Sequence, residues 1–146
     1  VLDEELLALA MSRMTATDPP LAVTDDELLA RFILFNGWFR KDGSLRQDGF
    51  MPPPPDFRLS VTRHIDLSDL AIWQIGQAVA DARPAATLHG RADLRVVDVK
   101  RQTLQVDAAP LPENLNHANI AGWPQDKPAQ KIIAIELAAS ARFVAR

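Results

Sequence analysis

Apolar and polar residues alternate most clearly in the second half of the chain. The pattern runs through FRLSVTRHI (57–65), where Leu59 and Val61 alternate with Ser60 and Thr62. Successive side chains of a strand point to opposite faces, so this stretch predicts a half-buried strand. ATLHGRADL (86–94) predicts another strand, and HANIAGW (117–123) predicts a short strand or turn. RVVDVKRQTLQV (95–106) stays open between a strand, which its valines favour, and a short helix.

Helical spacing dominates the first part of the chain. VLDEELLALA (1–10) places Leu2, Leu6, Leu9 and Ala10 on one stripe behind an acidic first turn. Paired prolines in TATDPPLAV (15–23) end that helix. Thr24 to Glu27 has the form of a capping box and predicts a second helix that ends near Asn36-Gly37. Its apolar residues are Leu28, Leu29, Phe32 and Ile33.

Two further helices are predicted towards the C-terminus. LAIWQIGQAVADA (70–82) follows a capping segment at Asp66 to Ser68, and Leu70, Trp73 and Ala78 are expected to face inward. A last helix begins at Asp126–Pro128, where proline suits the first turn. It is expected to run through Ile132, Ile133, Leu137, Ala141 and Val144.

These elements predict one α+β domain over residues 1–146. It would have a mainly helical part (1–50), a proline strut (51–56) and an α+β core (57–146). FNGWFRKDGSLRQDGF (35–50) holds Asn-Gly and Asp-Gly signals and predicts an irregular hairpin or loop. We expect a mixed or antiparallel sheet of about three to five strands. The last helix and the helix of Trp73 are expected to pack on one of its faces.

Composition narrows the functional classes. The chain has 146 residues, 47% of them hydrophobic, and a net charge of −3, which predicts a folded domain without the basic balance of a nucleic-acid binder. The basic excess in RADLRVVDVKR (91–101) is interpreted as a solvated face. There is no cysteine, so disulfides and thiolate chemistry are excluded. Without a signal-like or membrane-spanning stretch, the expected location is the cytoplasm.

Three polar clusters lie at the ends of predicted strands and are candidates for chemistry. They are Arg63-His64, His89 with Arg91, and Asn116-His117. If these segments are neighbours in one sheet, His64, His89 and His117 could act as acid and base. Arg63, Arg91 and Asn116 would then bind the ligand, since arginine holds phosphate at two points.

Each cluster also has a structural interpretation. Arg63-His64 could end a strand, and His89 before Gly90 could mark a bulge. Asn116 could form an Asx-turn while His117 satisfies loop carbonyls under Trp123. The histidines lack the close spacing of a preassembled metal site, so no metal and no cofactor are expected.

A longer pattern surrounds these clusters. GSLRQDGFMPPPPDFRLSVTRH, LHGRADL and NLNHANIAGWP resemble, in this order, a recurring pattern of small uncharacterised bacterial proteins with an LSV-x-R strand and an N-H-A-x-I element. The resemblance covers roughly residues 42–140 and implies that these elements belong to one domain. It implies no activity and no functional residue.

Two functional hypotheses remain. The first is a binding or accessory module, whose N-terminal stripe (Leu6, Leu7, Met11, Met14) could contact a protein partner or a second copy, or could equally be ordinary core. The second is a metal-independent phosphoester or nucleotide enzyme that uses the histidines and arginines named above. Neither hypothesis includes a membrane, and nucleic acid is not an expected partner.

Overall fold

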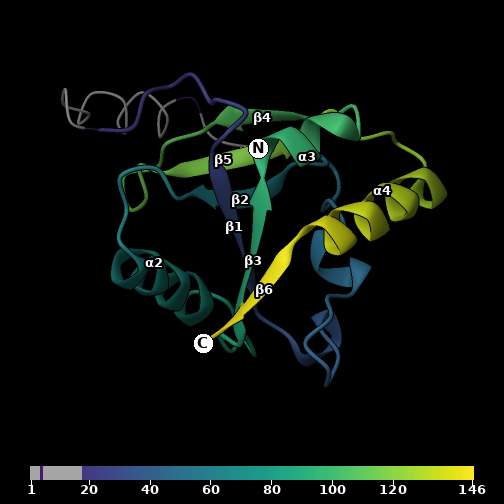
Figure 1. Ribbon diagram of the computed structural model, residues 1–146, viewed down its shortest axis with the longest axis horizontal. Coiled ribbons are helices and arrows are strands. Elements are labelled where there is room, and N and C mark those ends of the chain that lie inside the picture. Colours follow the sequence, from purple (N-terminus) through teal and green to yellow (C-terminus); the bar gives the residue numbers. More distant parts are fainter. Residues whose placement is uncertain (1–3, 5–17) are drawn as a thin grey trace.

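Six strands form one antiparallel sheet in the order β4-β5-β2-β1-β3-β6 (Figure 1). The structure is a computed structural model that describes residue 4 and residues 18–146. The strands are β1 (Leu28–Ile33), β2 (Leu59–Arg63), β3 (Gly90–Arg95), β4 (Gln105–Ala108), β5 (His117–Ala121) and β6 (Arg142–Ala145). The helices are α2 (Asp69–Asp81), α3 (Val96–Arg101) and α4 (Lys127–Ser140), with short 3-10 turns η1 (Asn36–Trp38) and η2 (Gln47–Phe50). The α+β class is confirmed, with six strands instead of three to five.

The sheet is covered on both faces. Ala30 and Phe32 of β1 pack with Ile72 and Ala80 of α2, whereas Leu29 on the same strand packs in a larger cluster. That larger cluster also contains residues of η2 and α4, including Phe50, Ala134 and Leu137. We call the two sides the α2 face and the α4 face. Figure 1 shows the two helices on opposite sides of the central strands, so the expectation that they share one face is wrong.

β1 replaces the helix expected after Thr24. Its residues LLARFI are buried except for Leu28 and the partly buried Arg31. A strand that is covered on both faces is apolar almost throughout, and such a run also satisfies helical spacing. One bond of the expected capping box is present nonetheless, since the Thr24 backbone N–H donates to Glu27 Oε2 at 2.8 Å, while the Glu27 N–H donates to the Thr24 carbonyl oxygen. These bonds close a turn that leads into β1.

β1 and β2 separate after a short contact. Their pairing comprises Leu29 with Arg63 and Ala30 with Thr62, whereas β1 pairs with β3 along its whole length. Beyond this contact the Arg31 guanidinium donates to the carbonyl oxygens of Gly49 at 2.8 Å and Ser60 at 3.1 Å. Burial, with the nearby charge of Arg83, lowers the pKa of Arg31 to about 10. β2 thus pairs with β1 at two residues and with β5 from Leu59 to Thr62.

α2 and α4 begin where the sequence predicts. Ser68 accepts a hydrogen bond from the Ala71 N–H, and Asp126 accepts one from the Ala129 N–H, so both helices have side-chain N-caps. The buried stripe of α2 is Ile72, Gly76 and Ala80. The expected inward residues are partly wrong, because Leu70 is 66% exposed and Ala78 is exposed, while Trp73 is half-buried.

The chain after Ser140 forms a strand instead of further helix. β6 pairs with β3, from Gly90 opposite Ala145 to Asp93 opposite Arg142. At Gly90 a Cβ atom would lie 2.5 Å from the Val144 carbonyl oxygen, so glycine permits the close approach of β6. The open stretch at residues 95–106 contains both alternatives, α3 followed by β4. The prediction that the helix extends through Val144 is wrong.

Two further expectations concern the N-terminal helical stripe and membrane-spanning segments. The helical stripe at residues 1–10 and its Leu-Met surface lie outside the described residues. Within the described part of the chain, no helix has the length and apolar character to cross a bilayer.

Candidate functional site

Arg63 is the largest fully buried side chain in the described part of the chain, and each of its three nitrogens donates a hydrogen bond. Its guanidinium donates to Glu27 Oε1 at 2.7 Å and Oε2 at 2.9 Å. It also donates to the carbonyl oxygens of Pro20 at 2.6 Å and Ala22 at 3.4 Å. A buried guanidinium needs such partners. Four of its five N–H groups are used in these bonds, and the side chain is 1% exposed. Arg63 therefore ties residues 20–27 to β2 and is not accessible to a phosphate.

Glu27 is held as a carboxylate by this arrangement. Burial on its own would raise the pKa of Glu27, but the hydrogen bonds from Arg63 and the Thr24 N–H, together with the Arg63 charge, lower it below 4.5. The Glu27 side chain is therefore ionised at neutral pH, and its contact with Arg63 serves the fold.

Arg91 and His64 do meet on the α2 face, around Asp93. Asp93 Oδ1 lies 3.0 Å from Arg91 Nε and 3.0 Å from His64 Nε2. Arg91 also reaches Asp69 at 3.0 Å and lies over the Trp73 ring, 4.7 Å from its centre. Asp69 and Trp73 belong to α2. The cluster therefore fastens the first turns of α2 to β3.

The side chain of His64 also faces a cavity. It lines a shallow cavity of about 320 Å³ with Thr24, Asp26, Glu27, Leu28 and Ile65. The acidic groups there have partners already, because Asp26 accepts from the Thr24 hydroxyl and Glu27 from Arg63. An imidazole against engaged carboxylates is a weak position for acid-base chemistry on a ligand.

His89 lies on the other side of the sheet. Its ring is 5.2 Å from that of Phe39, which stacks on Phe143 at 5.4 Å. Both phenylalanines pack against the cluster of the α4 face. His64 lies with Asp93 on the α2 face, so these two imidazoles have the sheet between them. The three histidines do not form one site.

Asn116 supports the loop before β5. Its side-chain amide donates to the carbonyl oxygens of Arg63 at 2.9 Å and Ile65 at 2.8 Å, and its backbone N–H donates to Asn114 Oδ1 at 3.1 Å. Both amide hydrogens are used in these bonds. The predicted side-chain to backbone bonding of this loop is therefore present, and Asn116 has no donor left for a ligand.

His117 begins β5, and one of its ring nitrogens is fixed. Nδ1 lies 2.8 Å from the Ala109 carbonyl oxygen. A carbonyl oxygen can only accept, so Nδ1 carries the hydrogen of the neutral ring. Burial lowers the pKa of His117, and the Ala109 bond and the Glu113 charge oppose that effect only in part. At neutral pH the ring is therefore neutral, with an unprotonated Nε2.

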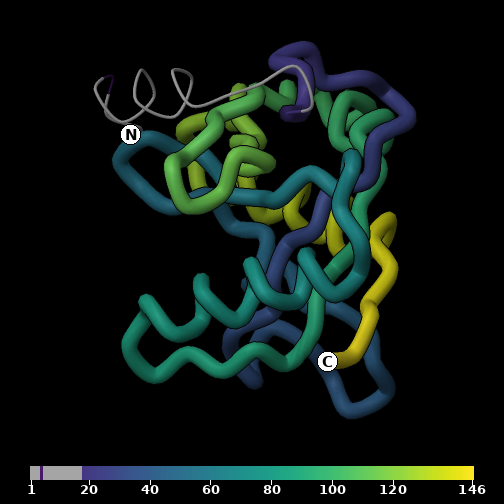
Figure 2. The backbone as a smooth tube through the Cα atoms, turned by 90° about the vertical axis from the view of Figure 1, so that its left-hand side faces the viewer, coloured from purple at the N-terminus to yellow at the C-terminus, as the bar shows by residue number. Residues whose placement is uncertain are grey.

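Cavities adjoin His117 on the α2 face. One of about 320 Å³ and a narrow one of about 50 Å³ share Ser60 and His117. The narrow cavity shares Val79 and Asn114 with a third, of about 420 Å³, beside α2. We call this row of adjoining cavities between α2, residues 109–116 and residues 53–58 the trough. Figure 2 shows α2 and these two loops projecting from the same side of the sheet.

The floor of the trough has free polar groups. Ser60 pairs with Asn119 across β2 and β5, and Thr62 pairs with His117, so all four side chains share the α2 face. In the part of the chain that the structure describes, the only buried side-chain polar atoms without a hydrogen bond are Arg91 Nη1 and His64 Nε2, whose contact with Asp93 is close but does not have hydrogen-bond geometry. His117 Nε2, the Ser60 hydroxyl and the Asn119 amide form no hydrogen bond with other described residues and are not among these buried atoms, and all three residues line the trough.

Sequence reasoning missed Ser60, Asn119 and Arg58 as lining residues. A signal for the first two exists, because polar residues alternate in phase in LSVTR and in HANIA. Two such strands, when paired, place all their polar positions on one face. The pairing itself depends on residues 55 or more positions apart in sequence, as for Thr62 with His117 and Ser60 with Asn119.

The described residues contain no group of three or more histidine, aspartate or glutamate side chains arranged to hold a metal ion. Comparison with protein-family models, with curated proteins and with solved structures finds no match to this chain.

Proposed function

We propose that the protein is a binding module that holds a small neutral ligand in the trough around His117. One observation carries this proposal: the bond from Nδ1–H to the Ala109 carbonyl leaves Nε2 as an acceptor that opens to the trough. A ring fixed in this way is a preorganised acceptor, because its tautomer and orientation are set before a ligand arrives.

The neighbours of Nε2 indicate the chemistry of the ligand. A ligand N–H or O–H would donate to His117, and a carbonyl beside it would accept from the Asn119 amide or the Ser60 hydroxyl. Leu111 and Pro53 provide apolar walls at this end of the trough, and Val79 does so beside α2. A flat amide or lactam with donor and acceptor side by side fits these groups. Cavities of several hundred Å³ suit small molecules of this kind.

The phosphoester hypothesis lacks support from the same geometry. Arg63 and Arg91 are engaged by carboxylates, His64 is beside Asp93, and His89 is on the opposite face. That hypothesis needs at least two imidazoles and a guanidinium around one phosphate.

Two finer parts of the proposal concern the surroundings of the module. The cysteine-free sequence suits a reducing compartment, so we place the module in the cytoplasm. We also retain a protein partner or second copy at the stripe of Leu6, Leu7, Met11 and Met14. Light scattering after size-exclusion chromatography tests self-association, and a monomer at high concentration removes the second copy.

Amide-resolved NMR tests the proposed site. Uracil, nicotinamide and benzamide are the probes, added to the ¹⁵N-labelled full chain at neutral pH. We expect shifts that concentrate on Ser60, His117 and Asn119. His117→Gln should weaken the best probe by about two- to tenfold, the worth of one hydrogen bond. His89→Gln, the same change on the opposite face, should leave binding unchanged.

Two results would contradict the proposal. One is the absence of shifts in the trough with every probe. The other is equal binding to wild type and His117→Gln. The ¹⁵N shifts of the His117 ring give an independent check, since they distinguish an Nδ1–H tautomer from an Nε2–H tautomer without any ligand.

A further inference from the structure

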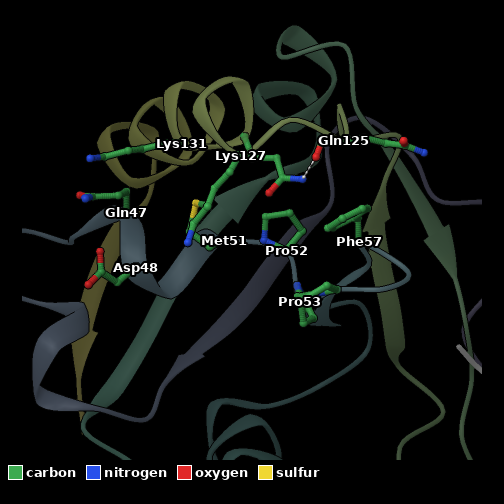
Figure 3. A pocket seen from close by; sticks show the side chains of 11 residues that line it. Gln47, Asp48, Met51, Pro52, Pro53, Phe57, Gln125, Lys127 and Lys131 are labelled. Atoms are coloured by element: carbon green, nitrogen blue, oxygen red, sulfur yellow. Dashed lines mark hydrogen bonds between the residues drawn. The ribbon is translucent and has the colours of Figure 1, made fainter.

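A second and larger cavity lies on the α4 face, between the prolines before β2 and the first half of α4. Its volume is about 670 Å³, within the range of small-molecule sites. Figure 3 shows the side chains that line it. We call it the α4 groove. It shares only Pro53 and Pro54 with the trough around His117, so the two cavities have different linings.

The floor of the α4 groove is apolar. Pro52 is buried, and Met51 and Phe57 are half-buried beside the core of the α4 face. The Phe57 N–H donates to the Pro53 carbonyl oxygen at 3.0 Å, and Phe57 has a left-handed backbone with φ of 53°. This turn presents the Phe57 ring to the groove (Figure 3). The floor can therefore cover the apolar body of a ligand.

The rim next to α4 is cationic. Lys127 and Lys131 are one helical turn apart and share a face of α4. Both are exposed, and neither forms an ion pair among the described residues. In Figure 3 Lys127 extends from the helix towards Met51, and Lys131 lies on the side of Gln47.

The remaining polar groups of the groove leave this positive charge in excess. Asp48 is the one carboxylate in its lining, against two ammonium groups. Gln130 is 4% exposed, and its amide donates to the Pro124 carbonyl oxygen at 2.8 Å, so it belongs to the wall. An apolar floor beneath two unpaired cations is complementary to a ligand with an apolar body and one negative charge.

We propose that the α4 groove binds a carboxylate with an unbranched apolar chain, that is, a medium-chain fatty acid. The chain lies over Met51, Pro52 and Phe57, and the carboxylate lies between Lys127 and Lys131. A cavity of about 670 Å³ is of the size that holds one small molecule. This site is independent of the neutral ligand proposed for the trough.

Calorimetry with decanoate, decanol and decyltrimethylammonium, each below its micelle concentration, tests the charge preference. We expect decanoate to bind most tightly and the cation not to bind. From octanoate to decanoate the affinity should rise about fourfold for each added methylene, because each buried methylene contributes a constant transfer free energy.

Matched lysine variants test the position of the carboxylate. Lys127→Gln with Lys131→Gln should weaken decanoate about tenfold and leave decanol unchanged. Lys41→Gln with Lys100→Gln removes the same charge elsewhere and should leave decanoate binding close to wild type. His117→Gln should also bind decanoate normally, which separates this site from the trough.

Several results would overturn the proposal: equal affinity for decanoate and decanol, equal loss in both double-lysine variants, or decanoate-induced NMR shifts away from Met51, Phe57 and Lys131. Binding of an acidic peptide in the groove without binding of decanoate would also overturn it, because the occupant would then be a protein segment.

Discussion

A single hydrogen bond at His117 determines which ring nitrogen can meet a ligand. The Ala109 carbonyl oxygen accepts a hydrogen bond from Nδ1–H. This contact supports the loop at residues 109–116 and leaves the lone pair of Nε2 without a hydrogen. The structural interpretation of His117 and the binding interpretation are therefore compatible. They predict different effects, since the first concerns stability and the second concerns ligand affinity.

The lowered pKa of His117 predicts a stability that depends on pH. In the unfolded chain the ring takes up a proton near pH 6.5, whereas burial delays protonation in the folded state to a lower pH. Below pH 6.5 the unfolded state therefore binds more protons, and the free energy of unfolding should fall as the pH is lowered towards the folded pKa. Above pH 6.5 this contribution does not vary.

Urea denaturation of wild type and His117→Gln at pH 8 and at lower pH measures this contribution. The contributions of all other titrating groups to the free energy of unfolding cancel in the difference between the two proteins. Gln retains an amide donor for Ala109 but does not titrate, so wild type should lose more stability on acidification. His117→Ala should cost about 1 kcal/mol at pH 8, as expected for one lost hydrogen bond. Equal acid sensitivity of wild type and His117→Gln would contradict the buried, neutral ring.

At the scale of elements, α2 lies unusually close to β1. Gly76 is on the buried stripe of the helix, and a Cβ atom there would lie 2.6 Å from Phe32 Cε1 and 2.7 Å from Cδ1. Phe32 is 6% exposed and packs among Ile72, Ala80 and Leu88. The ring has little room to move, so the distance between helix and sheet depends on this glycine.

Gly76→Ala should therefore destabilise the protein although alanine favours helices. The propensity gain is about 1 kcal/mol, and overpacking costs about 1–3 kcal/mol, so we expect a net loss of about 1 kcal/mol in denaturant. Gln74→Ala, an exposed position of the same helix, should change stability by less than about 0.5 kcal/mol. A stabilised Gly76→Ala would show that α2 does not pack this closely.

At the scale of the whole molecule, one sheet joins two apolar clusters. β1 contributes alternate residues to both, because Leu29 and Ile33 point to the α4 face while Ala30 and Phe32 point to the α2 face. Trp123 is part of the cluster on the α4 face, and Trp73 packs against the cluster on the α2 face. Loss of the central strand would disrupt both clusters, which predicts one cooperative unit.

Variants that retain a single tryptophan test this unit. Trp38→Phe with Trp73→Phe leaves Trp123, and Trp38→Phe with Trp123→Phe leaves Trp73. In each variant the fluorescence transition in denaturant should coincide with the transition of its own far-UV circular dichroism. An earlier fluorescence change in the variant that retains Trp73 would mean that the α2 layer unfolds separately.

The sequence by itself determined the elements whose signals are local. The alternation in 57–65, the caps at Ser68 and Asp126, and the turn residues around Asn114 and Asn116 correspond to β2, α2, α4 and the loop before β5. His117 at the start of a strand and Trp123 in the core were predicted for the same reason. These signals depend on residues a few positions apart, and such residues interact in almost any fold.

Tertiary structure alone decided the rest. LLARFI is a strand because both faces of the sheet are covered, and residues 142–145 form β6 because β3 has a free edge that Gly90 makes accessible. The fold also separates the candidate site residues, because His89 lies on the opposite face of the sheet and Arg63 forms an ion pair with Glu27. The pairing of β2 with β5 brings Ser60 and Asn119 beside His117. Register and face depend on partners distant in the chain, and shifting one pairing by a residue would exchange the two faces.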